Sequence, residues 1–286
     1  MTIRPTLDSR RGFARYYGGK TLDTVADTVG RLANRGVGAC VSLLPEMRFR
    51  PRGVEREKKD ILAILPSLRR RGLSADLTIK LSQLGQRWTP DDCFAALAEI
   101  ARQAAGHGAF VWIDMERAKD VDLTLEQYRA VRKIRSNVGL CLQTYLRRTK
   151  DDLERLLADG HPARLVKGYF RESSRDQFDT WRETTENMKK LLPPLIEGGV
   201  HPAVGTHDET VIAEAERLLA LHPRADFEYQ FFLGAKPHLP VDLARRGRRA
   251  RVYVPYGRLF RYFLHTAPKM DLSRNIQRAL GRAVIR

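Results

Sequence analysis

The chain has 286 residues and a net charge of +17, because 51 lysines and arginines outnumber 34 aspartates and glutamates. Hydrophobic residues make up 43% of it and charged residues 30%, which is typical of a folded protein and excludes disorder as its main state. No apolar run approaches the roughly 18 residues that a membrane span requires. The first residues lack the pattern of a secretory signal, so we expect a cytoplasmic protein.

The positive charge raises the question of a nucleic-acid or membrane partner. The basic residues are spread along the chain, as at Arg10, Arg69 and Arg147, and no RNA-binding, zinc-finger or basic-zipper motif accompanies them. We therefore expect no nucleic-acid partner, although a nucleic-acid-binding protein on a barrel that has lost catalysis is kept as an alternative. Peripheral contact with the inner face of an anionic membrane also stays open.

Eight short runs of aliphatic and β-branched residues, each bounded by Gly, Pro, Asn or Asp, are typical of strands. They predict strands at about 36–46, 76–85, 108–116, 137–145, 163–170, 201–208, 226–234 and 250–257.

Helical periodicity fills the intervals between these runs. Thr21 is expected to cap a helix that precedes the first strand. The starts of later helices are marked by Thr89 with Pro90, by a capping box of Thr124 with Gln127, by Thr149 and by Asp208. The long interval between Phe170 and Val200 predicts an additional helix.

Eight strands alternating with helices over about 250 residues indicate a (β/α)8 barrel. An open doubly wound sheet is the competing architecture, but it usually has a glycine-rich phosphate turn after its first strand, where this chain reads LLPEMRF. No Pro- or Gly-rich linker divides the chain. We predict an α/β protein with one domain over residues 1–286, a distorted TIM-like barrel with an N-terminal helical segment.

Polar side chains occur near the C-terminal ends of most predicted strands, where a parallel barrel is otherwise apolar. They are Thr78, Lys80, Ser82, Asp114, Glu116, Gln143, Tyr145, Arg164, Lys167, Thr206, His207, Glu228, Gln230, Tyr253 and Tyr256. Each one alone has an ordinary explanation as an ion-pair partner or hydrogen-bonding group. Because active sites of such barrels lie at the C-terminal end, the set together favours a ligand site there.

The residue inventory limits the chemistry of that site. No nucleophile elbow, P-loop or metal-ligand spacing occurs, and we predict no metal site. Asp114 with Glu228 could supply the two carboxylates of a glycosidase, although nothing else supports sugar chemistry. The remaining Lys, Arg, Gln, His and Tyr donors suit a large anionic ligand, and a flavin dinucleotide fits well.

The runs IKLSQLG, IDME, LQTYLRRTKDDL, RLVKGYF, THD, FEYQFFLG and RVYVPYG, in this order, resemble the proline dehydrogenase family of the monofunctional bacterial type. The likeness covers about Arg15 to Gly257. That family is a distorted (β/α)8 barrel that binds FAD. The resemblance implies FAD contacts at Gln143, Arg164, Lys167, Gly168, Thr206, His207 and Gln230.

The same resemblance implies catalytic roles for Lys80, Asp114, Tyr253 and Arg164, with Arg164 near the reactive edge of the flavin. It further implies a substrate-binding set of Glu46, Lys80, Phe170, Phe232, Tyr253, His265 and Thr266. The implied reaction is the dehydrogenation of an amine, with hydride transfer to flavin N5 and electron delivery to a quinone or another acceptor.

One departure from the family bears on the substrate. The family carries two adjacent arginines in its final helix, which clamp the carboxylate of proline, and a Glu shortly after them. Here His265 and Thr266 stand at the arginine positions and the Glu is missing. Since a bidentate arginine is the natural carboxylate clamp, the change predicts a proline-like or other amine as the substrate of a specialised homologue.

Two alternatives remain beside that prediction. One is ordinary L-proline dehydrogenation to 1-pyrroline-5-carboxylate with a quinone acceptor, in which Lys80 and a neighbouring Arg hold the carboxylate. The other is a flavin-binding protein without catalytic activity.

Overall fold

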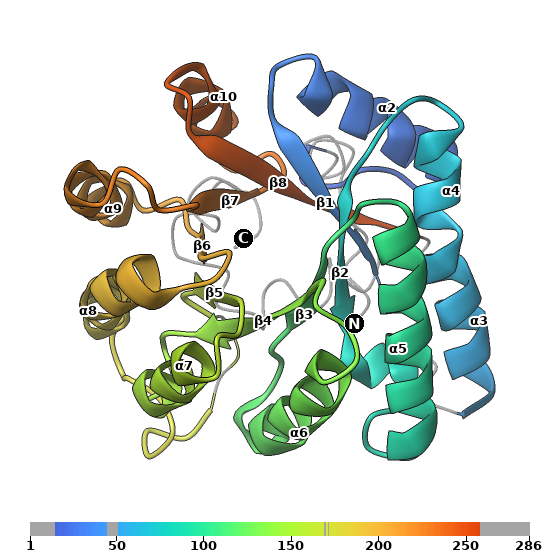
Figure 1. Ribbon diagram of the computed structural model, residues 1–286, viewed down its shortest axis with the longest axis horizontal. Coiled ribbons are helices and arrows are strands. Elements are labelled where there is room, and N and C mark those ends of the chain that lie inside the picture. Colours follow the sequence, from blue (N-terminus) through green and yellow to red (C-terminus); the bar gives the residue numbers. More distant parts are fainter. Residues whose placement is uncertain (1–14, 45–50, 169, 171, 258–286) are drawn as a thin grey trace, which may run out of the picture.

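The computed structural model describes residues 15–44, 51–168, 170 and 172–257. In that part of the chain, eight parallel strands close into a barrel in the order β1 to β8, and β8 pairs with β1 (Figure 1). The helices surround this barrel (Figure 1). The predicted (β/α)8 architecture is confirmed.

All eight predicted strands are present, but each is shorter at one or both ends than the run that predicted it. Their bounds are β1 (Gly38–Leu43), β2 (Asp76–Lys80), β3 (Val111–Asp114), β4 (Val138–Gln143), β5 (Ala163–Val166), β6 (Ala203–Gly205), β7 (Glu228–Phe232) and β8 (Arg249–Tyr256). The strand predicted at 76–85 ends at Lys80, and the chain continues as a short 3-10 helix, η1 (Leu81–Leu84).

The helices follow the strands with few exceptions. Their bounds are α2 (Leu22–Ala33), α3 (Pro51–Leu62), α4 (Ile64–Arg69), α5 (Pro90–Gly106), η2 (Ala118–Asp120), α6 (Val121–Arg132), α7 (Thr149–Ala158), α8 (Trp181–Gly198), α9 (Glu209–Leu221) and α10 (His238–Arg245). No helix start was predicted for α3, α4 or α10. None of the helices in the described ranges is long and apolar enough to cross a bilayer.

Three of the predicted helix starts are confirmed. The Thr21 hydroxyl accepts a hydrogen bond from the Thr24 N–H at the start of α2, and the Asp208 carboxylate accepts one from the Thr210 N–H at the start of α9. Thr89 is the N-cap residue of α5 and Pro90 its first helical residue, although the Thr89 side chain makes no capping hydrogen bond. Thr149 instead is the first helical residue of α7, and its hydroxyl donates to the Gln143 carbonyl.

The capping box predicted for Thr124 and Gln127 is wrong. The helix α6 begins at Val121, so both residues lie inside it. The Thr124 hydroxyl accepts a hydrogen bond from the Gln86 side chain at 2.8 Å, and the Gln127 amide donates to the Pro90 carbonyl at 3.2 Å. These side chains tie α6 to its neighbour instead of starting it.

The additional helix predicted between Phe170 and Val200 is also not found in the described residues. That interval holds one helix, α8, which begins with a capping box of Thr180 and Glu183. The rest of its length is irregular chain that leads from β5 to the helix.

Each strand is buried on two faces, one toward the helices and one toward the barrel axis. Residues such as Leu77, Ile79 and Val111 join the large apolar cluster between the sheet and the helices. The alternate residues point toward the barrel axis, where Cys40, Trp112 and Ala203 form a small separate cluster. Polar side chains such as Lys80, Asp114 and Arg164 take other axial positions, and they build the site.

Candidate functional site

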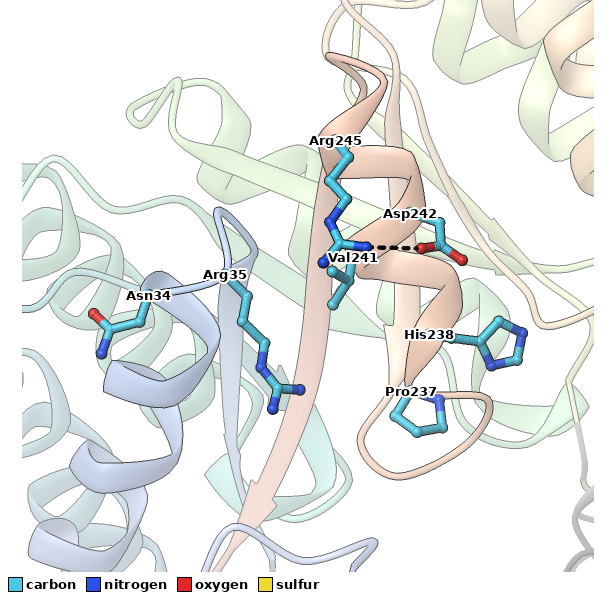
Figure 2. Close-up of a pocket in the computed structure, with 7 residues that line it drawn as sticks. All are labelled: Asn34, Arg35, Pro237, His238, Val241, Asp242 and Arg245. Carbon is cyan, nitrogen blue, oxygen red and sulfur yellow. Dashed lines mark ion pairs between the residues drawn. The ribbon is translucent and has the colours of Figure 1, made fainter.

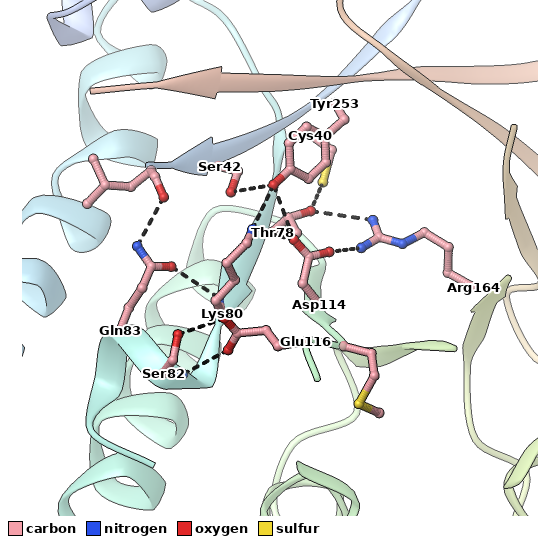
Figure 3. Close-up of polar contacts among 12 residues, drawn as sticks. Cys40, Ser42, Thr78, Lys80, Ser82, Gln83, Asp114, Glu116, Arg164 and Tyr253 are labelled. Carbon is pink, nitrogen blue, oxygen red and sulfur yellow. Dashed lines mark hydrogen bonds and ion pairs between the residues drawn. The ribbon is translucent and has the colours of Figure 1, made fainter. Parts of the chain in front are cut away.

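The Asp114 carboxylate holds two cations at the C-terminal end of β3. The Lys80 ammonium lies 2.7 Å from one of its oxygens, and the Arg164 guanidinium lies 2.6 Å from the other (Figure 3). The three side chains come from β2, β3 and β5 and are largely buried, with 14%, 15% and 3% of the side chain exposed for Lys80, Asp114 and Arg164. Two cations on one anion leave this group of three side chains with a positive charge.

The Tyr253 hydroxyl joins the same centre from β8. It accepts a hydrogen bond from the Lys80 ammonium at 3.0 Å and lies 2.9 Å from the Ser42 hydroxyl and 3.1 Å from the Asp114 carboxylate (Figure 3). Burial, followed by the Asp114 charge, raises the pKa of Tyr253 to about 12. The phenol is therefore neutral at pH 7 and acts as a hydrogen-bonding group. Its ring stacks on Phe232, with 5.5 Å between the ring centroids.

The Arg164 guanidinium is fixed on further sides. One of its nitrogens donates to the Gln230 side-chain oxygen at 2.8 Å, and its carbon lies 5.1 Å from the centroid of the Trp112 ring. Trp112 has room because Gly139 stands opposite: a Cβ on Gly139 would lie 2.6 Å from that ring.

A second polar cluster lies where β5 and β6 end. The Lys167 ammonium lies 2.5 Å from the Asp208 carboxylate and 2.6 Å from the Thr185 hydroxyl, and 4.1 Å from the centroid of the Trp181 ring. Although burial opposes ionisation of Asp208, the hydrogen bond from Lys167 lowers its pKa to about 2. The Thr206 hydroxyl accepts a hydrogen bond from the Asp208 N–H.

His207 is partly buried beside this cluster. The Phe232 N–H donates to its Nε2 atom at 2.9 Å, so the proton of the neutral ring is on Nδ1. Burial lowers the pKa of His207 to about 4. At pH 7 the ring is neutral and offers one N–H donor.

Gln143 is the last residue of β4, and one of its two polar side-chain atoms has a hydrogen-bond partner. Its amide nitrogen donates to the Met115 carbonyl at 3.1 Å. Among the described residues, the buried Gln143 Oε1 atom and the buried Tyr145 hydroxyl lack a hydrogen-bond partner. Gly168, with φ +91°, packs so closely on Tyr145 that a Cβ there would lie 2.1 Å from its ring.

Two residues of the predicted polar set do not join the site. Glu228 is the first residue of β7, and its carboxylate binds Arg251 near the opposite end of the barrel, so it cannot face Asp114 as a glycosidase pair would. Tyr256 points away from the axis, because it is an odd number of residues from Tyr253, and its hydroxyl donates to the Asp60 carbonyl.

The remaining predicted substrate residues are only partly placed. Phe170 is half-buried, and the Arg117 guanidinium lies 5.5 Å from the centroid of its ring. Glu46, His265 and Thr266 lie outside the described residues. Ser42, which was not among the predicted site residues, is buried near the C-terminal end of β1 and alternates with Cys40 toward the axis.

A surface hollow of about 660 Å³ lies on the outer flank of the barrel, away from these clusters. Asn34 and Arg35 line it just after the end of α2, and it is closed on the other side by α10 and the residue before it, with Pro237, His238, Val241, Asp242 and Arg245 (Figure 2). It contains none of the residues predicted to bind the cofactor or the substrate.

Comparisons with known proteins identify the family. A family model described as Proline dehydrogenase matches residues 25–263. Proline dehydrogenase 1 of Bacillus subtilis (strain 168) is 30% identical over 259 residues, which cover 90% of this chain and 86% of the relative. A proline dehydrogenase of Deinococcus radiodurans is 30% identical over 252 residues, which cover 85% of this chain and 81% of the relative.

Solved structures of proline utilization A proteins share the fold. The protein from Bdellovibrio bacteriovorus superposes with a TM-score of 0.81 at 18% identity over 96% of this chain. A variant of the Bradyrhizobium japonicum protein superposes with a TM-score of 0.77 at 19% identity over 96% of this chain. This chain spans about a third of their length, 33% and 32%. Together with the sequence matches, these findings establish that the chain belongs to the proline dehydrogenase family, whose members are oxidoreductases acting on CH–NH groups.

Proposed function

We propose that this chain is an L-proline dehydrogenase, which oxidises free proline at its C–N bond. The observation that carries the proposal is the cluster of Lys80, Asp114, Arg164 and Tyr253 at the C-terminal end of a barrel of this family. The curated relatives carry the name proline dehydrogenase, and they support ordinary proline oxidation better than the altered substrate that the sequence analysis preferred.

FAD is the cofactor that the site residues fit. The unpaired Gln143 Oε1 atom needs a donor, and an isoalloxazine edge has a ring N–H. Arg164 and Lys167 are buried cations suited to the electron-rich parts of a dinucleotide, and the His207 Nδ1–H supplies a further donor. Thr206, Gly168 and Gln230 complete the proposed FAD-binding set. When bound, FAD supplies the hydride acceptor of the reaction.

The side chains of this protein then bind and orient the substrate. The Lys80 ammonium offers charge to the proline carboxylate, and Asp114 holds that ammonium in place. Tyr253 gives a neutral hydroxyl, and its stacked partner Phe232 offers an apolar wall. Proline loses a hydride from the carbon next to nitrogen and a proton from nitrogen, which leaves 1-pyrroline-5-carboxylate. No covalent bond to the protein is required, since binding and orientation are sufficient.

We propose a quinone as the electron acceptor and a cytoplasmic location with peripheral contact at an anionic membrane. The support for membrane contact is the net charge of +17, which favours an anionic surface.

A second candidate keeps the altered substrate. His265 and Thr266 stand where the family carries its arginine pair, and this favours an amine without a free carboxylate. Turnover with an artificial acceptor separates the two candidates when L-proline, L-proline methyl ester and pyrrolidine are compared. We expect the highest kcat/KM for L-proline, and a higher kcat/KM for the ester or for pyrrolidine would favour the second candidate.

A further inference from the structure

Glu228 is a buried carboxylate without a part in the proposed reaction. It is 2% exposed, and its oxygens accept hydrogen bonds from the Arg251 Nε atom at 2.9 and 3.0 Å and lie 3.3 Å from an Arg249 nitrogen. Arg251 has a second counter-ion, because the Asp76 carboxylate lies 3.2 Å from its NH1 atom. The charge of Arg251 is therefore shared by two acids near the N-terminal end of the barrel.

Glu228 has a contact that leads toward the site, whereas the further contact of Asp76 is with the Phe110 N–H. The Gln230 amide nitrogen donates to Glu228 at 2.7 Å, and the Gln230 oxygen accepts from Arg164 at 2.8 Å. A glutamine side chain between a carboxylate and a guanidinium has one favourable orientation. If the amide turned by half a rotation, its NH2 group would face the guanidinium donors and its oxygen would face the carboxylate oxygens. Gln230 is 3% exposed, so bulk water cannot relieve that conflict.

These contacts form a continuous line of polar groups inside the barrel. It runs through Asp76, Arg251, Glu228, Gln230, Arg164 and Asp114. Buried networks of this kind fix each member through its neighbours.

We propose that Glu228 is a positioning residue for Arg164, and that it acts by fixing the amide orientation of Gln230. The inference rests on the proposed function, in which Arg164 lies beside the flavin. It means that a residue in the N-terminal half of the barrel influences the surroundings of the flavin. The simpler role, neutralisation of Arg251 and Arg249 alone, is the competing explanation.

The variant Glu228→Asp separates these explanations, because its shorter side chain keeps the negative charge beside Arg251 but withdraws the oxygen that accepts from Gln230. A glutamine at this position is not suitable, since the Glu228 Oε1 atom contacts both the Arg251 Nε atom and the Gln230 amide nitrogen and an amide oxygen could keep both contacts. Asp76→Asn is the control, because it removes one acid from Arg251 and its carboxylate otherwise accepts from the Phe110 N–H. If Glu228→Asp does not fold, Glu228→Met tests the same link, since its side chain offers Gln230 no oxygen.

We expect Glu228→Asp to shift the flavin midpoint potential to more negative values, because Gln230 no longer holds its oxygen toward Arg164 and the Arg164 charge moves away. Flavin reduction by proline in a single turnover should slow by roughly tenfold to a hundredfold, the scale of a displaced active-site group. Asp76→Asn should leave the potential unchanged and the rate within about twofold. An effect of Asp76→Asn as large as that of Glu228→Asp would overturn the proposal in favour of charge neutralisation alone.

A double-mutant cycle tests the link without relying on flavin or proline. In urea unfolding of the full chain as purified, we expect Glu228→Asp combined with Gln230→Leu to lose less stability than the two single losses added together. Asp76→Asn combined with Gln230→Leu should be additive. Additive losses for Glu228 and Gln230 would overturn the positioning role. A wild-type chain that binds FAD but does not oxidise proline would overturn only the proposed function, because the potential and the cycle still report on Glu228.

Discussion

Lys80 and Asp114 stand directly opposite each other in the register of β2 and β3, and the ammonium of one lies 2.7 Å from the carboxylate of the other. The backbone pairing therefore brings the ion pair together. A slip of one of these strands by one residue would turn its side chain toward the helices and separate the pair. Arg164 approaches the second Asp114 oxygen from β5, so three strands meet at one carboxylate.

The first prediction concerns the charge at this meeting point. Asp114→Asn leaves two buried cations without their shared counter-ion, and we expect the free energy of unfolding to fall by about 3–5 kcal/mol. Urea unfolding at pH 7 measures it. Asp27→Asn is the control, because its pair with Arg71 is 53% and 42% exposed and its loss should be below about 1 kcal/mol. Similar losses for both variants would show that the Asp114 charge is not needed.

A second prediction isolates the Tyr253 hydroxyl. Tyr253→Phe keeps the ring on Phe232 but removes the group that bridges Lys80, Asp114 and Ser42. We expect a loss of about 1–2 kcal/mol in stability and a fall in kcat/KM for proline of about tenfold. Steady-state kinetics and urea unfolding provide both numbers.

Tyr256→Phe makes the same chemical change on the same strand. Its hydroxyl faces the Asp60 carbonyl outside the barrel, so kcat/KM should stay within about twofold of the wild type. A matching loss of activity in both variants would remove the special role of Tyr253.

The third prediction follows from the neutral His207 ring. Folding lowers the pKa of His207 from 6.5 to about 4, so the unfolded chain binds more protons between these values. This stabilising contribution is fully present above pH 6.5 and is lost as the pH falls toward 4. It amounts to about 3 kcal/mol.

His207→Gln keeps an acceptor for the Phe232 N–H but cannot titrate. The wild type should therefore lose about 3 kcal/mol more than the variant when urea unfolding is compared at pH 7 and pH 4. The same pH dependence in both proteins would contradict a buried neutral histidine.

The fourth prediction uses two glycines with left-handed backbone. Gly36→Ala and Gly168→Ala both place a Cβ at positive φ, which costs roughly 1–2 kcal/mol. At Gly36 nothing lies within 4 Å of the new atom, whereas at Gly168 it would lie 2.1 Å from the Tyr145 ring. Gly168→Ala should cost about 1–3 kcal/mol more and reduce the bound flavin. Thermal unfolding and flavin content measure both, and equal losses would refute the close packing.

Much of the barrel was predictable because strand alternation is a local signal. It placed Thr78 and Lys80 on one face of β2, and Asp114 followed from the same reasoning on β3. Strand ends were less predictable. The alternation of polar residues continues in the sequence beyond the last residue of a strand. Ser82, for example, lies in η1, and its hydroxyl donates to the Glu116 carboxylate.

Other features depended on contacts between distant segments. Arg251 sits among basic residues in the sequence, yet it lies inside the barrel with Glu228, and alternation with Tyr253 was the signal that could have found it. Thr124 and Gln127 match a capping box, but the helix begins earlier because tertiary contacts use both side chains. Local patterns cannot report such partners.

The most direct test of the central claim is the visible absorption spectrum of the purified chain before and after anaerobic addition of L-proline. The account predicts a bound flavin spectrum that bleaches when proline is added. A chain that stays colourless after reconstitution with FAD, or a bound flavin that proline does not reduce, would contradict it.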